Sequence, residues 1–214
     1  MKKISFLSLL ALTAMFSCNK PVTIDLLENE DLSNWSFFLP DTVNASDVFF
    51  MEEGILNVSG VPTGYMRTKE VFHSYELSLE WRWIAEPGNS GVLLHTTGED
   101  LQWPNCIEAQ LWSGKAGDFV LIGEGAGFTL NDTARLVTSE ENRYKVFPKI
   151  EDSSEKAAGE WNTYKIVVDK DNISLSVNDV LQNTCSAATK TWGNISLQSE
   201  GAPMQFRNIL ITLK

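Results

Sequence analysis

The segment "NCIEAQLW", residues 105–112, carries three side chains that could do chemistry together. In an extended chain successive side chains point to opposite faces, so Glu108, Gln110 and Trp112 share one face and the apolar residues between them share the other. A carboxylate can transfer a proton, an amide can hydrogen-bond hydroxyl groups, and an indole can cover the apolar face of a sugar ring. The pattern predicts a carbohydrate-binding groove that contains a proton-transfer group.

Other polar side chains alternate away from the apolar positions of their own predicted strands. If these strands are neighbours, the side chains meet Glu108 in one groove; we expect substrate contacts from Glu80, Arg82, Gln110, Trp112, Lys115, Gln198 and Arg207. Arg207 could instead form a structural ion pair.

Two residues are candidates for a catalytic base, Glu108 and His95. A histidine on a half-buried strand, such as His95, is more often a hydrogen-bonded structural residue than a base. A developing negative charge on substrate could be held by Arg82, by Lys115 or by a divalent metal. Such a metal would take Glu80, His95 and Glu108 as ligands, because borderline cations accept imidazole and carboxylate together.

The elements that must position these residues are almost all strands. Alternating apolar residues predict strands at 75–83, 90–96, 194–200 and 204–213 and a hairpin within 163–181, with a bulge at Arg207-Asn208. Many short strands separated by turns indicate an all-β sandwich or jelly roll. The segment 122–160 is long and irregular, and we expect it to lie over one sheet face. Within it, 131–146 is a candidate short helix.

The first residues resemble an export signal. Lys2 and Lys3 precede an apolar run over 4–16, and Ser17-Cys18 follows as a cleavage site. This pattern predicts a lipoprotein signal peptide at 1–17, with Cys18 acylated and the protein held in the cell envelope, at the periplasmic or outer-membrane surface. Met15 and Phe16 fit the lipoprotein pattern only loosely, so a plain secretory signal is the alternative. We expect a lead-in at 18–33 and one domain at 34–214.

The composition and net charge of the chain limit the classes of partner that it can bind. The chain has 214 residues, a net charge of −11 and 43% hydrophobic residues, as expected of one acidic globular domain. This charge disfavours nucleic acid and anionic lipid, so we expect no nucleic-acid partner and no membrane contact beyond the lipid anchor. An exported protein could pair Cys106 with Cys185, although we favour two unpaired thiols.

Four segments together resemble one family: "EWRWIAEPGNSGVLLHT" (80–96), "NCIEAQLW" (105–112), "GEWNTYKIVV" (159–168) and "NISLQSEGAPMQFRNILI" (194–211). In this order they resemble the 3-keto-disaccharide hydrolase, or 3-keto-glucoside lyase/hydratase, domain, over roughly 35–214. The resemblance implies a concanavalin-like jelly roll of two antiparallel sheets. It also implies an enzyme that cleaves 3-keto-glycosides by abstraction of the C2 proton, elimination and hydration. A non-catalytic carbohydrate-binding jelly roll is the alternative.

The chain departs from this family at two positions. His95 stands where the family usually has Arg, and Gln198-Ser199-Glu200 stands where it has Gln-x-His. The chain also differs from jelly-roll glucanases, which carry Glu-x-Asp-x-x-Glu on one strand, because Glu108, Gln110 and Ser113 occupy those positions. Hydrolysis by two carboxylates from this one strand is therefore not expected.

Overall fold

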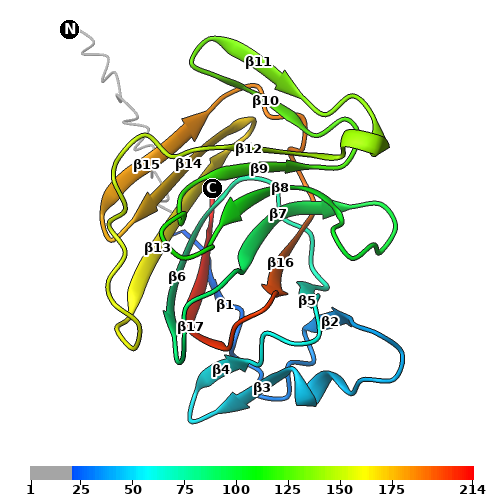
Figure 1. Ribbon diagram of the computed structural model, residues 1–214, viewed down its shortest axis with the longest axis vertical. Helices are drawn as coiled ribbons and strands as arrows, with labels where there is room; N and C mark the ends of the chain where they lie inside the picture. The colour runs from blue at the N-terminus through cyan, green and yellow to red at the C-terminus, as the bar shows by residue number, and fades with distance from the viewer. Residues whose placement is uncertain (1–20) are drawn as a thin grey trace, which may run out of the picture.

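The computed structural model describes residues 21–214 and consists of two antiparallel β-sheets packed face to face (Figure 1). The only helical segments in this range are two single 3-10 turns, η1 (Ala45–Asp47) and η2 (Glu140–Asn142). The prediction of an all-β, concanavalin-like jelly-roll sandwich is confirmed. None of the helices in the described range is long and apolar enough to cross a membrane.

One sheet has eight strands. Its order is β15-β14-β13-β6-β17-β4-β3, and β1 also pairs with β17. The strands are β1 (Thr23–Asp25), β3 (Phe49–Glu52), β4 (Ile55–Val58), β6 (Tyr75–Trp83), β13 (Asn162–Asp169), β14 (Asn172–Val177), β15 (Val180–Cys185) and β17 (Met204–Leu213).

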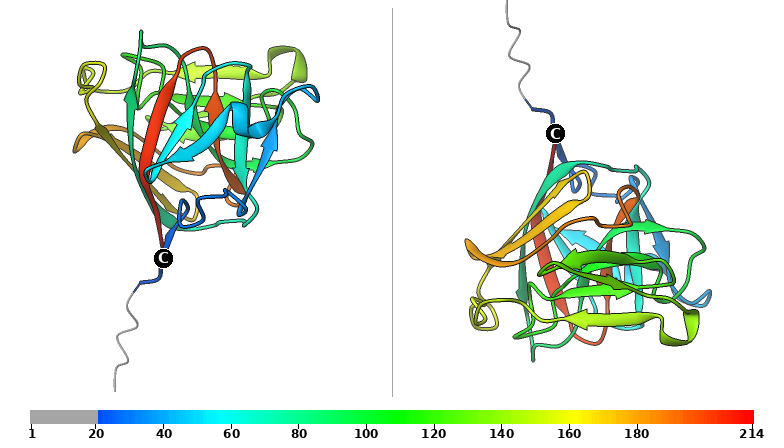
Figure 2. Two further views of the ribbon diagram at one scale, coloured as in Figure 1. Left: turned by 90° about the horizontal axis from the view of Figure 1, so that it is seen from below. Right: turned by 90° about the horizontal axis from the view of Figure 1, so that it is seen from above.

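The other sheet has seven strands in the order β12-β9-β8-β7-β16-β5-β2. They are β2 (Trp35–Phe38), β5 (Gly64–Thr68), β7 (Gly91–Thr97), β8 (Asn105–Gln110), β9 (Phe119–Ile122), β12 (Tyr144–Phe147) and β16 (Asn194–Ser199). A separate hairpin of β10 (Gly127–Leu130) and β11 (Thr133–Leu136) lies beside this sandwich (Figure 1). Figure 2 shows the two layers from both ends.

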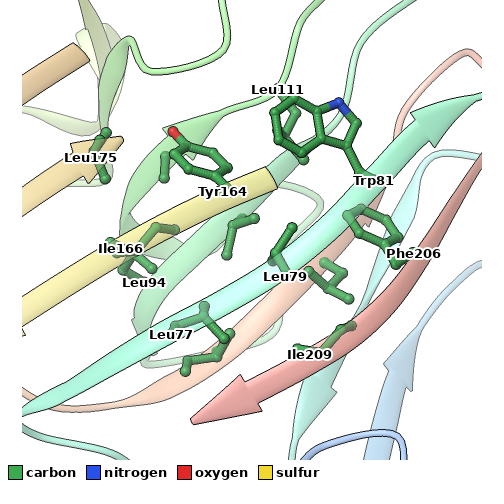
Figure 3. Close-up of a cluster of buried hydrophobic side chains, with 14 of the residues drawn as sticks. Leu77, Leu79, Trp81, Leu94, Leu111, Tyr164, Ile166, Leu175, Phe206 and Ile209 are labelled. Carbon is green, nitrogen blue, oxygen red and sulfur yellow. The ribbon is translucent and has the colours of Figure 1, made fainter. Parts of the chain in front are cut away.

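The core lies between the two sheets and follows the alternation of each strand. In β6 the residues at odd positions from Tyr75 to Trp83 are buried, and those between them are partly exposed. Leu77, Leu79 and Trp81 pack with Ile166 and Phe206 of the neighbouring strands (Figure 3). Because each sheet buries one face in this way, the side chains on the opposite faces are free to form binding sites.

Three segments, the end of the chain, 131–146 and the predicted lead-in, compare with the sequence predictions as follows. The bulge is confirmed, because the register between β17 and β6 shifts after Arg207 and Asn208 has a positive φ. The short helix expected within 131–146 is limited to the single 3-10 turn η2, and the rest of the segment forms β11 and the start of β12. The predicted lead-in is partly structured, since β1 pairs with β17 and Leu26 and Leu27 join the core.

The described residues include two of the cysteines but not the predicted signal peptide. Cys106 and Cys185 are both free and buried, as favoured from the sequence. The predicted signal peptide at 1–17 and the predicted acylation of Cys18 lie outside the described residues.

Candidate functional site

A pocket of about 470 Å³ lies on the outer face of the seven-stranded sheet. It is lined by Asn89, Trp103, Glu108, Gln110, Trp112, Lys115, Asp118, Val120, Ile122, Tyr144, Val146, Pro148 and Glu200. Carboxyl and amide groups gather toward β8 and the end of β16, and apolar side chains gather on β9 and β12. The pocket therefore offers a polar region for hydroxyl groups beside an apolar region.

Strand β8 brings the central polar residues to this pocket. Ile107 and Ala109 point into the core, so Glu108 and Gln110 point outward. In the sheet, Glu108 pairs with Leu93 on one side and with Val120 on the other. A carboxyl group is thereby held above two apolar neighbours, where few water molecules can reach it.

Glu108 is buried and incompletely hydrogen-bonded. Its side chain is 4% exposed, and Oε1 has no hydrogen-bond partner among residues 21–214. Burial raises the pKa of Glu108 well above its ordinary value, and the negative charge of Glu200 raises it further. Burial therefore favours the protonated form of Glu108, which can donate a proton.

Gly91 explains how the Glu108 side chain finds room. A Cβ atom on Gly91 would collide with Glu108 Oε1 and with Gln198 Oε1, so both side chains lean over the bare glycine backbone. Gln198 Oε1 is also buried, and it too finds no donor within the described chain. Two oxygens thus face one small space without a protein donor, which suits a hydroxyl group of a ligand.

The turn after β8 is fixed by Gln110. Its Oε1 accepts hydrogen bonds from the backbone N–H groups of Leu111 and Trp112, each at 2.8 Å. This turn leaves the Trp112 indole 55% exposed at the pocket rim and brings Lys115 to the pocket lining. An indole and an ammonium group therefore border the polar region.

The lining residues that were not assigned a role from the sequence include Glu200, Asn89 and Trp103. Burial raises the pKa of Glu200, while hydrogen bonding from the Trp103 and Asn89 side chains lowers it. Glu200 follows Gln198 by two positions, so strand alternation could have placed it on the same face. Asn89 and Trp103 come from loops, where no periodic pattern reports which way a side chain points.

The apolar region comes from the segment expected to lie over a sheet face. Part of that segment, β12, instead extends the sheet beside β9. Tyr144 and Val146 thereby join Val120 and Ile122 in the pocket lining.

The expectation that Glu80, Arg82 and Arg207 share this groove is wrong. These residues lie on β6 and β17, which belong to the eight-stranded sheet, so their outward side chains face away from the pocket across the whole sandwich. Arg207 donates a hydrogen bond to Glu80 at 2.6 Å. Its guanidinium also lies 4.1 Å from the ring centre of Trp161, and that of Arg82 lies 4.5 Å from it. The cluster is a structural ion pair with cation–π contacts.

His95 is also outside the pocket, because β7 contains a bulge that the alternation did not reveal. The pairing with β8 shifts between Leu94 and Thr97, and His95 has a φ of 55°. The bulge turns the His95 ring toward the core, 5.7 Å from the Tyr75 ring, and Nδ1 lies 2.8 Å from the Lys190 carbonyl oxygen. Burial lowers the pKa of His95 and so favours the neutral ring.

The metal site imagined from Glu80, His95 and Glu108 does not form. Glu80 lies on the outer face of the eight-stranded sheet, His95 lies in the core, and Glu108 lies on the outer face of the seven-stranded sheet. Across residues 21–214, no group of three or more His, Cys, Asp or Glu side chains is arranged to hold a metal ion.

A second hollow, of about 530 Å³, lies over β13, β14, β15 and the turn between β10 and β11. Its lining includes Asp132, Asp169 and Asn172. None of its lining residues has a buried side-chain polar atom without a partner in the described part of the chain. The unsatisfied buried oxygens that suggest a ligand are therefore found at the Glu108 pocket and not here.

Solved structures with a similar fold include enzymes and a binding module. A Parabacteroides distasonis protein assigned as a glycosyl hydrolase aligns with a TM-score of 0.63 and 18% identity, covering 90% of this chain and 100% of that one. The β-glucanase of Bacillus licheniformis aligns with a TM-score of 0.57 and 12% identity, covering 92% and 99%. The carbohydrate-binding module CBM66 of Bacillus subtilis aligns with a TM-score of 0.55 and 11% identity, covering 82% of this chain and 93% of that one. At these identities the likeness concerns the fold.

Sequence comparison is more specific. No curated protein matches the chain. A family model does match, over residues 23–212, which is nearly the whole described range. It is the model of a carbohydrate-active domain, and the match agrees with the resemblance carried by the four sequence segments. The chain therefore belongs to the 3-keto-alpha-glucoside-1,2-lyase-like domain family.

Proposed function

We propose that this protein is an enzyme that cleaves the glycosidic bond of 3-keto-glycosides in the pocket around Glu108. The observation that carries the proposal is the Glu108 carboxyl group, which is buried, lacks a hydrogen-bond partner for Oε1 within residues 21–214, and lies above Gly91 in the pocket. Family membership supplies the substrate class. A buried carboxyl group in a water-poor pocket is suited to proton transfer.

The pocket lining fits a glycoside. The exposed indoles of Trp103 and Trp112 can cover the apolar face of a sugar ring, and Gln198 Oε1 can accept a hydrogen bond from a sugar hydroxyl. The apolar region around Val120 and Val146 can receive the less polar part of the leaving group.

The reaction uses the ketone at C3 of the sugar. This ketone acidifies the hydrogen on C2, so a base can remove it to form an enolate, and the C1–oxygen bond then breaks. Addition of water to the resulting double bond completes a net hydrolysis. Lys115 lines the pocket and is the cation we assign to stabilise the enolate oxygen, while Glu108 transfers a proton.

The test compares a 3-keto-glycoside with the same glycoside that carries a hydroxyl group at C3. Purified protein should release the leaving group only from the keto form, with and without chelator. Glu108→Gln keeps the side-chain volume and should lower turnover by about 10²–10⁴-fold, the usual contribution of a general acid or base. Circular dichroism of the variant verifies that the fold is retained.

The alternative is a carbohydrate-binding protein that does not catalyse a reaction. Binding of the 3-keto-glycoside by calorimetry, without any release of product or of an unsaturated intermediate, would establish the alternative and refute the enzyme.

We also propose that the mature protein is anchored in the cell envelope through acylated Cys18. Mass spectrometry of the mature N-terminus should find a lipid-modified cysteine. An unmodified N-terminus at another residue would refute the anchor.

A further inference from the structure

Glu200 is a second carboxyl group in the Glu108 pocket. It directly follows β16, and its backbone forms a bridge with Asn89. Strand β7 separates β8 from β16, so the two acidic residues come from backbones about 10 Å apart. Both side chains line the same pocket, so a ligand bound there can contact both.

The two carboxyl groups have different surroundings. Glu108 is buried above Gly91, and its Oε1 has no hydrogen-bond partner in the described chain. Glu200 is only partly buried; burial raises its pKa, and the neighbouring Trp103 and Asn89 side chains offset part of this rise. Burial thus raises the pKa of Glu108 well above its ordinary value and that of Glu200 less, so Glu108 is the stronger candidate to hold a proton and Glu200 to lose one.

We propose that Glu200 is the base that removes the C2 proton, and that Glu108 is the acid that protonates the leaving oxygen. This inference rests on the proposed function and assigns a second catalytic residue to it. It also replaces the expectation that Glu108 is the base.

The proposed steps balance in atoms and electrons. The Glu200 carboxylate takes the C2 proton, the C–H electron pair becomes the enolate, the C1–O bond breaks, and the departing oxygen takes the proton of Glu108. In the hydration step the Glu108 carboxylate removes a proton from water while the water oxygen bonds to C1, and Glu200 returns its proton to C2. Both residues then regain their starting states, so one pair serves elimination and hydration.

Hydrogen exchange isolates the first step. The 3-keto derivative of 1,5-anhydroglucitol carries no aglycone at C1, so in D₂O it reports removal of the C2 proton without release of an alcohol. Proton NMR follows loss of the C2 signal separately from that of the C4 hydrogen, which also lies next to the ketone. Glu200→Gln should lower the enzymatic exchange rate by about 10²–10⁴-fold. Glu108→Gln should retain the rate within about threefold, because the acid acts only on a leaving group. Glu86→Gln, in an exposed loop, is the matched control and should behave as the wild type.

Leaving groups of different basicity isolate the second role. Glu108→Gln should slow release of methanol from a 3-keto methyl glycoside by about 10²–10⁴-fold, and release of 4-nitrophenolate by no more than about threefold, because nitrophenolate leaves without a proton. Glu200→Gln should slow both reactions equally.

A substitution that changes the base itself gives a further readout. Glu200→His should keep measurable exchange and move its acidic limb toward the pKa of imidazole, about 6.5. The other titratable groups of the pocket lining, Glu108, Lys115, Asp118 and Tyr144, stay the same in this comparison.

Two outcomes separate this inference from the proposed function. If the wild type releases leaving groups and Glu200→Gln exchanges and turns over at the wild-type rate, the assignment of Glu200 is wrong and the proposed function stands. If the wild type neither exchanges hydrogen nor releases any leaving group, the proposed function is wrong and this inference falls with it.

Discussion

Gly91→Ala is the substitution that tests most directly how the pocket is built. Gly91 lies on β7, and its φ is not in the left-handed region, so the backbone itself accepts alanine. The added Cβ would collide with Glu108 Oε1 and Gln198 Oε1, whereas ordinary contacts begin at 3.4 Å. Both side chains must therefore withdraw by about 1 Å, a misplacement that can cost ~10²-fold in rate.

The same substitution should leave the fold intact. Replacing glycine by alanine within a strand gains about 0.5–1 kcal/mol, and crowding of a packed site costs about 1–3 kcal/mol. We therefore expect a net loss of at most about 2.5 kcal/mol, which lowers Tm by no more than about 10 °C in a chain of this size. A large loss of activity together with a small loss of stability is the expected signature.

The assay is kcat/KM on a 3-keto-glycoside, measured beside thermal unfolding. Gly127→Ala is the matched control, because its Cβ would lie 2.7 Å from the Arg135 carbonyl oxygen and 2.8 Å from Leu136 Cδ1, away from the pocket. It should cost stability and leave activity unchanged. Combining Gly91→Ala with Glu108→Gln should lower the rate little beyond Glu108→Gln alone. Wild-type kcat/KM in a folded Gly91→Ala protein would refute the placement of the catalytic carboxyl group.

Three further variants probe the surroundings of the pocket. Glu108→Gln should raise Tm at pH 8 more than at pH 4. The pKa of the Glu108 carboxyl group is raised in the folded state, so the wild-type protein loses stability as the pH rises above the ordinary pKa of a glutamate, and glutamine removes this loss. Equal gains at both pH values would contradict the burial argument. Trp112→Ala should raise KM about threefold to tenfold with kcat nearly unchanged, as expected for loss of one stacking surface, and an unchanged KM would remove Trp112 from the binding site. His95→Gln should lower stability by about 1–3 kcal/mol, measured by denaturant unfolding, and leave kcat within about twofold, because the ring packs on Tyr75 in the core; a large loss of kcat in a stable protein would return His95 to the catalytic site.

Strand alternation in the sequence predicted much of this architecture, and it failed where a bulge interrupts a strand. Within a regular strand the rule holds, so Glu108 and Gln110 were assigned to the correct face of β8. At the β7 bulge the rule breaks, and His95 turns inward although simple alternation places it outside. A bulge of this kind leaves no mark in the apolar pattern, because the buried His95 is itself polar.

Alternation also says nothing about which sheet a strand joins. Glu80 and Arg82 do point outward, but β6 pairs with β13 and β17, so they lie on the opposite side of the sandwich. Pairing between strands distant in sequence depends on contacts that a local pattern does not contain. The loops that supply Asn89 and Trp103 carry no period at all.

The position of Glu200 shows what a search along one strand overlooks. Judged on β8 alone, the chain lacks a second acid, because Gln110 and Ser113 stand where glucanase-like strands carry carboxylates. The sheet supplies the second carboxyl group from the end of β16, on the far side of β7. Because Gly91 of β7 has no side chain, the space between β8 and β16 is open to Glu108 and Gln198. Glu108 is buried and Glu200 is only partly buried, so burial raises the pKa of Glu108 more than that of Glu200. Separation of the pair across three strands is thus the feature that lets one residue begin as acid and the other as base.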